Sequence, residues 1–222
     1  MPTISPDGPI WTLDLGADEN RFSLEWLELV DSALDELEAS AEPAVLVTSG
    51  TGKFYSNGLD LDWLVQNFDQ HAAYVAKVQT LLARVLTLPV PTVAAINGHA
   101  FGAGAMLALA HDYRVMRDDR GYFCFPEIDI QIPFTAGMTA LITSKLSPRA
   151  AFDVMATGRR FSGVDAAAAG VVERAVSLDE LPDVATGLVS DLAGKDRTTL
   201  GTIKSRMYAE AVDALRRPAQ ES

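Results

Sequence analysis

The sequence predicts an α/β fold in which most strands pair in parallel. Two observations carry this prediction. Short apolar runs rich in β-branched residues, such as 44–48 and 92–96, are typical of buried strands. Segments with apolar residues at helical spacing follow them, beginning with Leu27, Val30 and Leu34. Because such strands and helices alternate along the chain, the pairing of the strands is expected to be largely parallel.

Each element has its own signal. Strands are indicated by alternation or by short β-branched runs, and they are expected at 9–15, 44–48, 92–96, 113–116, 122–125 and 171–176. Helices are indicated by apolar residues three or four positions apart, and they are expected at 27–37, 61–68, 78–85, 103–110 and 197–217. Pro89 and Pro91 end the third helix, and Leu200, Ile203, Met207 and Ala211 would pack the last one.

The composition fits one globular core of 222 residues, with 48% hydrophobic and 22% charged residues. A formal net charge of −12 argues against nonspecific binding to nucleic acid. No apolar run reaches membrane-span length, and the first residues do not resemble a signal peptide, so we expect a cytoplasmic location and no membrane partner. Cys124 is the sole cysteine, and the three histidines are not at metal-ligand spacing, so no metal site is expected.

Two glycine-bearing loops and one carboxylate are the most informative features. The loops are 54–60 and 97–104, and each is expected to open into a helix. A helix start leaves backbone N–H groups unpaired, and two such groups can hold an oxyanion. Glu127 lies downstream and can move a proton. Together these features predict carbonyl chemistry through an enolate, without a metal or a side-chain nucleophile.

An ordered series of motifs spans most of the chain, and it is similar to the crotonase superfamily, also called the enoyl-CoA hydratase/isomerase family. The resemblance covers roughly residues 9 to 204. Its pieces are 53–60, 95–104, 112–114, 125–128, 157–161 and 166–172. It implies a crotonase-like spiral of ββα turns over residues 1–190, and a helical C-terminal region over 191–222. It also implies a homotrimer or hexamer, and an acyl-CoA substrate with no separate cofactor.

The resemblance also assigns roles at the site. The backbone N–H groups of Leu59 and Ala103 would hold the thioester oxygen, and Glu127 would move the proton. Contacts with the CoA substrate are expected at Asn57, Gly58, Gly102 and Gly104. Lys53 is the first candidate for the CoA phosphates, Arg21 and Lys204 are weaker ones, and the alternative for each of the three is a plain surface charge. The alternative for the glycines is that they only permit tight turns.

The carboxylates favour one reaction within the family. By the resemblance, hydratases carry two catalytic glutamates. In this chain the first of the two positions is occupied by Met106 and the second by Glu127. One carboxylate suffices to move a proton from C2 to C4, which is the Δ3,Δ2-enoyl-CoA isomerase reaction. Met106, Phe134 and Ile132 are expected to exclude water and to raise the pKa of Glu127. A dienoyl-CoA isomerase would need aspartates where Met106 and Thr135 stand.

Several alternatives remain open. Another crotonase activity, such as weak hydration or thioester hydrolysis, fits the same loops, and so does a non-catalytic acyl-CoA-binding member. Asp60 and Asp129 lie near the motifs, but a helix-start carboxylate and an alternate strand residue are the preferred interpretations. His99 either approaches the thioester or packs the loop. Gln131 stands where the family usually has glycine, so the backbone there is expected to differ.

Overall fold

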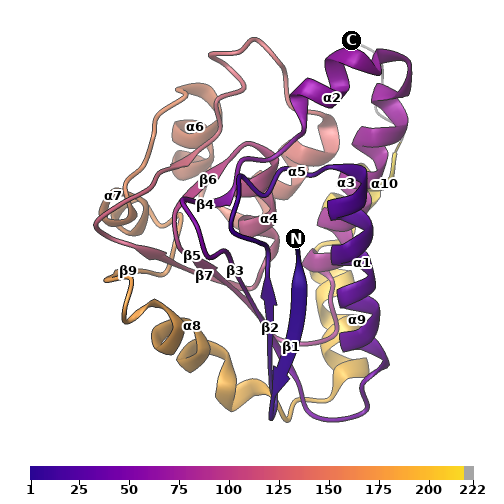
Figure 1. Ribbon diagram of the computed structural model, residues 1–222, viewed down its shortest axis with the longest axis vertical. Coiled ribbons are helices and arrows are strands. Elements are labelled where there is room, and N and C mark those ends of the chain that lie inside the picture. The colour runs from indigo at the N-terminus through magenta and orange to yellow at the C-terminus, as the bar shows by residue number, and fades with distance from the viewer. Residues whose placement is uncertain (218–222) are drawn as a thin grey trace.

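A computed structural model describes residues 1–217 of the chain. Its central sheet has six strands in the order β1-β2-β3-β5-β7-β9 (Figure 1). Strands β1 and β2 are antiparallel, and the remaining neighbours pair in parallel. The strands are β1 (Thr3–Asp7), β2 (Ile10–Asp14), β3 (Val45–Ser49), β5 (Thr92–Ile96), β7 (Tyr113–Arg117) and β9 (Arg174–Val176).

A second, smaller sheet lies beside the ends of the first. Its three parallel strands are β4 (Phe54–Ser56), β6 (His99–Phe101) and β8 (Phe123–Cys124), in that order. Strands β4 and β6 lie within the two segments that the sequence predicts as glycine loops. Strands of two or three residues are too short to show alternation, so the sequence pattern did not separate them from the loops.

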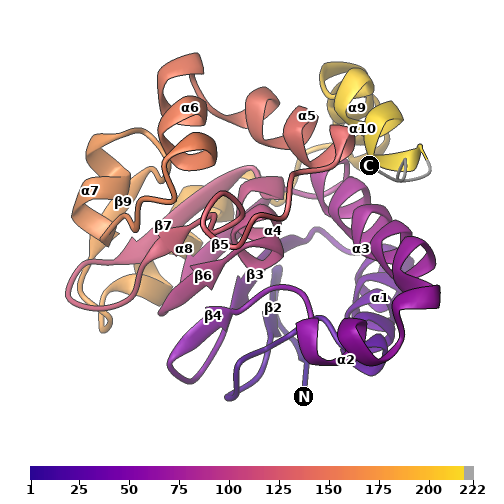
Figure 2. The same ribbon diagram turned by 90° about the horizontal axis from the view of Figure 1, so that it is seen from above.

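Helices surround the two sheets, with α1 and α3 together on one side and α6 and α7 at the opposite end (Figures 1 and 2). The α-helices are α1 (Leu24–Ala39), α2 (Leu61–Gln66), α3 (His71–Leu86), α4 (Ala103–Ala110), α5 (Ala136–Lys145), α6 (Pro148–Ala156), α7 (Gly163–Ala168), α8 (Leu181–Val189), α9 (Arg197–Met207) and α10 (Ala209–Arg216). Two short 3₁₀ helices are η1 (Phe68–Gln70) and η2 (Ser190–Leu192).

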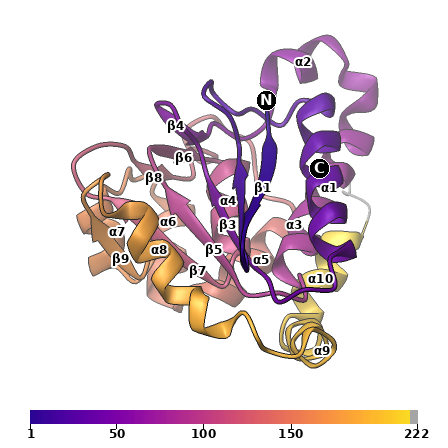
Figure 3. The ribbon, with the colours of Figure 1, turned by 60° about the horizontal axis from the view of Figure 1, so that its bottom comes forward.

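The two faces of the central sheet are covered by different helices. Alternate residues such as Val45 and Val47 face helix α8, which lies across one face of the sheet (Figure 3). Leu46 and Ile96 face the other way, into the larger core that contains α1, α3 and α4. Every residue of α4 is buried, which explains why its sequence is apolar on all sides.

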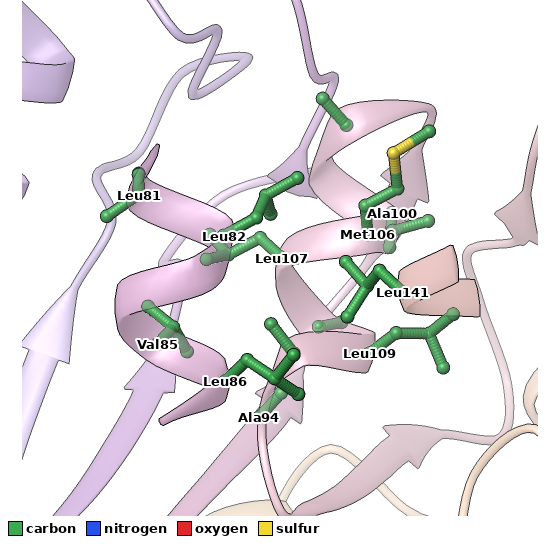
Figure 4. Packing of buried hydrophobic residues seen from close by; sticks show 14 of the residues in the cluster. Leu81, Leu82, Val85, Leu86, Ala94, Ala100, Met106, Leu107, Leu109 and Leu141 are labelled. Atoms are coloured by element: carbon green, nitrogen blue, oxygen red, sulfur yellow. The ribbon is translucent and has the colours of Figure 1, made fainter. Parts of the chain in front are cut away.

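Helices α3, α4 and α5 form the centre of the larger core. Figure 4 shows Leu82 of α3 pointing toward Leu107 of α4, and Leu141 of α5 on the other side of α4. The first residue of α4 is Ala103, so this packing fixes the direction in which the start of α4 points.

Apart from their ends, the structure confirms the predicted strands and most of the predicted helices. Strands β1, β4 and β6 and helices α5 to α8 have no individually predicted counterpart, and one predicted helix is divided. Strand β1 has no predicted counterpart, because it is a mostly exposed edge strand without alternation. The predicted helix 197–217 is two helices that meet at Tyr208. Ala211 is buried, whereas Ile203 and Met207 are exposed, so the predicted packing face is wrong for α9.

The expected C-terminal region extends to residue 222, and residues 218–222 lie outside the described part; its boundary at residue 190 stays a prediction. Within residues 1–217, no helix combines the length and the apolar character that a membrane span requires.

Candidate active site

The first loop leaves β4 at Ser56 and turns at Gly58, whose φ is +79°. The N–H of Phe22 donates to the carbonyl oxygen of Gly58 at 2.8 Å. In a trans peptide the N–H points opposite to the C=O, so the N–H of Leu59 points away from Phe22. Within residues 1–217 this N–H has no hydrogen-bond acceptor, so it is free to bind a ligand.

The second loop leaves β6 at Phe101 and turns at Gly102, whose φ is +50°. The N–H of Gly102 donates to Cys124 O of strand β8 at 3.0 Å, and its carbonyl accepts the first bond of α4 from the N–H of Met106 at 3.0 Å. The N–H of Ala103 therefore points out of the helix start, and it has no acceptor in the described chain. The helix dipole favours negative charge at this point.

The two loops are in backbone contact, which explains their glycines. A methyl group on Gly58 would lie 2.7 Å from Phe101 O and 2.9 Å from the nitrogen of Ala103. One on Gly104 would lie 2.5 Å from Ser56 O. Real Cβ atoms do not come this close, so both positions require glycine. The requirement goes beyond a tight turn, because these glycines bring the two free N–H groups together.

Glu127 lies next to the second loop. It begins a turn after Pro126, in which Pro126 O accepts the N–H of Asp129 at 2.9 Å. A methyl group on Gly102 would find Oε1 of Glu127 as its nearest neighbour, at 3.5 Å. Its other oxygen, Oε2, is buried and has no hydrogen-bond partner within residues 1–217. Burial raises the pKa of Glu127 to about 7, which suits a group that accepts and returns a proton near neutral pH.

The three residues that are expected to surround Glu127 differ in their burial. The ring of Phe134 meets Phe125 edge-on at 5.7 Å, and Phe125 lies two residues before Glu127. Met106 is buried in α4, and its side chain leans toward the helix start, as helical side chains do (Figure 4). Ile132, in contrast, is 44% exposed and therefore covers less of the site than expected.

Of the two carboxylates near the motifs, Asp60 has the structural role that the sequence predicts and Asp129 does not. Asp60 caps helix α2, because its carboxylate accepts the N–H of Trp63 at 3.2 Å. The expectation that Asp129 is a strand residue is wrong, because Asp129 lies exposed in the turn that follows Glu127. Gln131 has a φ of +58°, so the backbone there has the left-handed conformation that favours glycine, although the residue is glutamine.

The residues expected to contact CoA differ in their surroundings. Lys53 is exposed, and its ammonium group lies 5.1 Å from the centre of the Phe54 ring. The N–H of Asn57 donates to Glu19 O at 2.8 Å. Arg21 already forms ion pairs with Glu19 and Asp62, so its charge is balanced within the protein.

The nomination of Lys204 for a CoA phosphate is wrong. Its amino group is buried, lies 2.6 Å from the carboxylate of Asp112, and donates to Leu88 O at 3.0 Å and Val90 O at 2.9 Å. These partners use its three donors, so Lys204 ties α9 to the core instead of facing a ligand.

His99 packs within the small sheet. Its ring lies 5.3 Å from the Phe54 ring, 5.0 Å from that of Phe101 and 5.6 Å from that of Tyr122. Burial lowers the pKa of His99, and the nearby charge of Lys53 lowers it further. These contacts support the loop-packing interpretation.

Two residues that support the site, Phe22 and Tyr74, were not identified from the sequence. The Phe22 N–H orients the peptide of Leu59, and the Tyr74 hydroxyl accepts the N–H of Asp60 at 2.9 Å. Both act through contacts between segments that are distant in the chain, which no local pattern reveals. In the part of the chain that the structure describes, no group of three His, Cys, Asp or Glu side chains is arranged to hold a metal ion.

The chain is similar to known proteins over most of its length. The family model described as enoyl-CoA hydratase/isomerase matches residues 11–221. A relative from Arabidopsis thaliana, named enoyl-CoA delta isomerase 3, is 36% identical over 95% of this chain and 93% of its own. A putative enoyl-CoA hydratase from Thermus thermophilus is 33% identical over 86% of this chain and 76% of its own.

Solved structures show the same fold. The human mitochondrial delta3-delta2-enoyl-CoA isomerase superimposes with a TM-score of 0.87 at 23% identity, covering 96% of this chain and 85% of that chain. The α/β class with its central parallel sheet and C-terminal helices is thus the crotonase fold that the sequence predicts. The chain belongs to the enoyl-CoA hydratase/isomerase family.

Proposed function

We propose that this protein is a Δ3,Δ2-enoyl-CoA isomerase that moves the double bond of a 3-enoyl-CoA to the 2-position. The observation that carries the proposal is a single carboxylate with a buried, unpaired oxygen, Glu127, beside the backbone contact that brings two free N–H groups together. The relative from Arabidopsis thaliana that is named a delta isomerase supports the same reaction.

The reaction follows from the positions of these groups. The Glu127 carboxylate removes a proton from C2 of the 3-enoyl-CoA, and the electron pair moves onto the thioester oxygen to give a dienolate. The N–H groups of Leu59 and Ala103 stabilise the negative charge on that oxygen. Glu127 then returns the same proton to C4, and the double bond lies between C2 and C3. The proton count is unchanged, and CoA serves only as part of the substrate.

Met106 separates this reaction from hydration. A hydratase of the family would place a second carboxylate at this position to help to bind and activate water. Here the position holds a buried thioether, which offers only a weak hydrogen-bond acceptor. Buried apolar surroundings also keep the Glu127 pKa high enough for the carboxyl group to give the proton back.

The remaining contacts extend the proposal. Lys53 is the exposed cation that we assign to a CoA phosphate, and Gly58, Gly102 and Gly104 let the backbone approach the thioester. By family resemblance we also propose a homotrimer or hexamer, which sedimentation of the purified protein would test.

A paired assay tests the reaction. Purified protein is mixed separately with a 3-enoyl-CoA and a 2-enoyl-CoA, and the absorbance of the conjugated thioester is followed. We expect a rise with the 3-enoyl substrate that disappears in Glu127→Gln. A fall with the 2-enoyl substrate would show that water is added despite Met106 and would move the assignment to a hydratase. No change with either would contradict both activities.

A further inference from the structure

Tyr74 contacts the peptide groups around Leu59 from inside the core. It belongs to helix α3 and is 2% exposed. Its hydroxyl donates to Phe22 O at 2.8 Å and accepts the N–H of Asp60 at 2.9 Å. The ring packs against Trp63, with ring centres 5.4 Å apart. Both hydrogen-bonding roles of the hydroxyl are therefore used, and both partners belong to the segments that frame the first loop.

These two bonds hold the peptide groups on either side of Leu59. The peptide that follows Leu59 is held directly, because its N–H belongs to Asp60. The peptide that precedes Leu59 is held through Phe22, whose N–H donates to Gly58 O while its own carbonyl accepts the Tyr74 hydroxyl. One hydroxyl group therefore restrains the rotation of both peptide planes.

We propose that Tyr74 is a positioning residue, whose hydroxyl aims the Leu59 N–H at the thioester oxygen. This inference rests on the proposed function, because it assigns Leu59 as an oxyanion donor. Hydrogen bonds weaken steeply as their angle departs from linear, and an oxyanion donor stabilises the transition state only when it is held in advance. Loss of the hydroxyl would leave Leu59 in place but would let its N–H rotate away.

Tyr55 provides a matched control within the same chain. It is also fully buried, and its hydroxyl makes a hydrogen bond to the Thr48 hydroxyl at 2.7 Å. Thr48 in turn bonds to His111, away from the peptides that flank Leu59. Tyr55→Phe and Tyr74→Phe remove the same atom from two buried rings, one with a single hydrogen bond and one with two. A purely structural role therefore predicts a loss of stability in both variants and a selective loss of kcat in neither.

The experiment compares Tyr74→Phe and Tyr55→Phe with the unaltered protein in kcat, KM and urea unfolding. We expect Tyr74→Phe to lower kcat by about 10- to 100-fold while KM stays within about twofold, because a donor to the transition state is weakened. Tyr55→Phe is expected to lower stability and to leave kcat unchanged. Equal kcat for Tyr74→Phe and the unaltered protein, or equal losses in both variants, would overturn the inference.

A spectroscopic measurement separates this inference from the proposed reaction. In a Glu127→Gln background, a bound aromatic 2-enoyl-CoA should absorb at longer wavelength than the free thioester, since the two N–H groups polarise its carbonyl. Adding Tyr74→Phe should reduce that shift, and adding Tyr55→Phe should not. A shift that Tyr74→Phe does not reduce would overturn the role of Tyr74, whether or not the unaltered protein is active in the isomerase assay. Failure of the unaltered protein in that assay would overturn the proposed function alone.

A second variant covers the case in which Tyr74→Phe does not fold. Incorporation of 3-fluorotyrosine at position 74 keeps the ring and both hydrogen bonds. It weakens the hydroxyl as an acceptor for the Asp60 N–H and strengthens it as a donor to Phe22 O, so the balance between the two restraints changes. We expect an altered kcat with KM unchanged, and no effect of the same replacement at position 55. Unchanged kcat at position 74 would contradict the inference.

Discussion

Gly58 and Ala103 lie in direct backbone contact, so close that a methyl group on Gly58 would be 2.9 Å from the Ala103 nitrogen. This contact joins the turn of the first loop to the first residue of α4. It brings the two free N–H groups to one place, although they belong to different strand-to-helix connections. The geometry of the pair thus depends on the absence of a single side chain.

We therefore predict that Gly58→Ala separates the two donors and lowers kcat by about 100-fold, the typical effect of losing one oxyanion donor. The matched control is Gly170→Ala. Gly170 has a similar φ of +70°, but a methyl group there would meet nothing within 4 Å. Both substitutions should cost roughly 1–3 kcal/mol of backbone strain in urea unfolding. Gly58→Ala should cost more, because its methyl group also meets backbone atoms, and only Gly58→Ala should affect turnover. Full kcat in Gly58→Ala would show that the contact is not needed.

The pH dependence of turnover should report Glu127. Because burial raises its pKa to about 7, the carboxylate form that removes the C2 proton is scarce at pH 5 and abundant at pH 9. We expect kcat/KM for a 3-enoyl-CoA to rise with pH and to level off above a midpoint near 7. A midpoint near 4.5, the ordinary value for a glutamate, would mean that Glu127 is well solvated in the working enzyme.

The same pKa predicts how stability changes with pH. The folded state holds the Glu127 proton more tightly than the unfolded chain does, because the pKa rises from 4.5 to about 7 on folding. The associated stability is fully present below pH 4.5 and is lost as the pH rises through about 7. Glu127→Gln has no such proton, so its free energy of unfolding relative to the original protein should increase by roughly 3 kcal/mol across this window. A difference that stays constant from pH 4 to 8 would contradict the buried state of this carboxyl group.

Lys204 should matter for stability and not for CoA binding. Lys204→Met keeps the apolar stem but leaves the buried side of Asp112 and two carbonyl groups without the ammonium group. We expect a loss of about 3–5 kcal/mol in urea unfolding, with unchanged affinity for an acyl-CoA by calorimetry. Lys195→Met, at an exposed lysine of the same region, is the control and should change neither quantity. Weakened CoA binding in a folded Lys204→Met protein would restore the phosphate assignment.

In contrast to Lys204, Lys53 is expected to contribute to CoA binding. Lys53→Ala should raise the KM for an acyl-CoA about tenfold, the equivalent of about 1.4 kcal/mol, and should leave kcat unchanged because the charge lies away from the reacting carbons. Lys77→Ala, which removes another exposed lysine from α3, is the matched control. If both variants show the KM of the original protein, the CoA phosphates bind elsewhere.

Local patterns in the sequence predict much of the fold and of the site. Helix α4 begins and ends at the predicted residues, Ala103 and Ala110, because its glycine start and apolar run are strong local signals. Strands β4 and β6 were hidden in the predicted loops, because their pairing depends on segments that are far apart in the chain. The burial of Lys204 was equally invisible, since its partners Leu88, Val90 and Asp112 come from another part of the chain.

The proposed donors are main-chain groups, oriented by Phe22 at Leu59 and by Gly102 and Met106 at Ala103. Under that proposal the side chains at positions 59 and 103 take no part in the proton transfer. Ala103 is 2% exposed within the core, and Leu59 packs against the core, so both side chains serve packing. A replacement of Leu59 by another apolar residue of similar volume should therefore leave turnover intact, which makes the chemistry of this site tolerant of sequence change at one of its two donor positions.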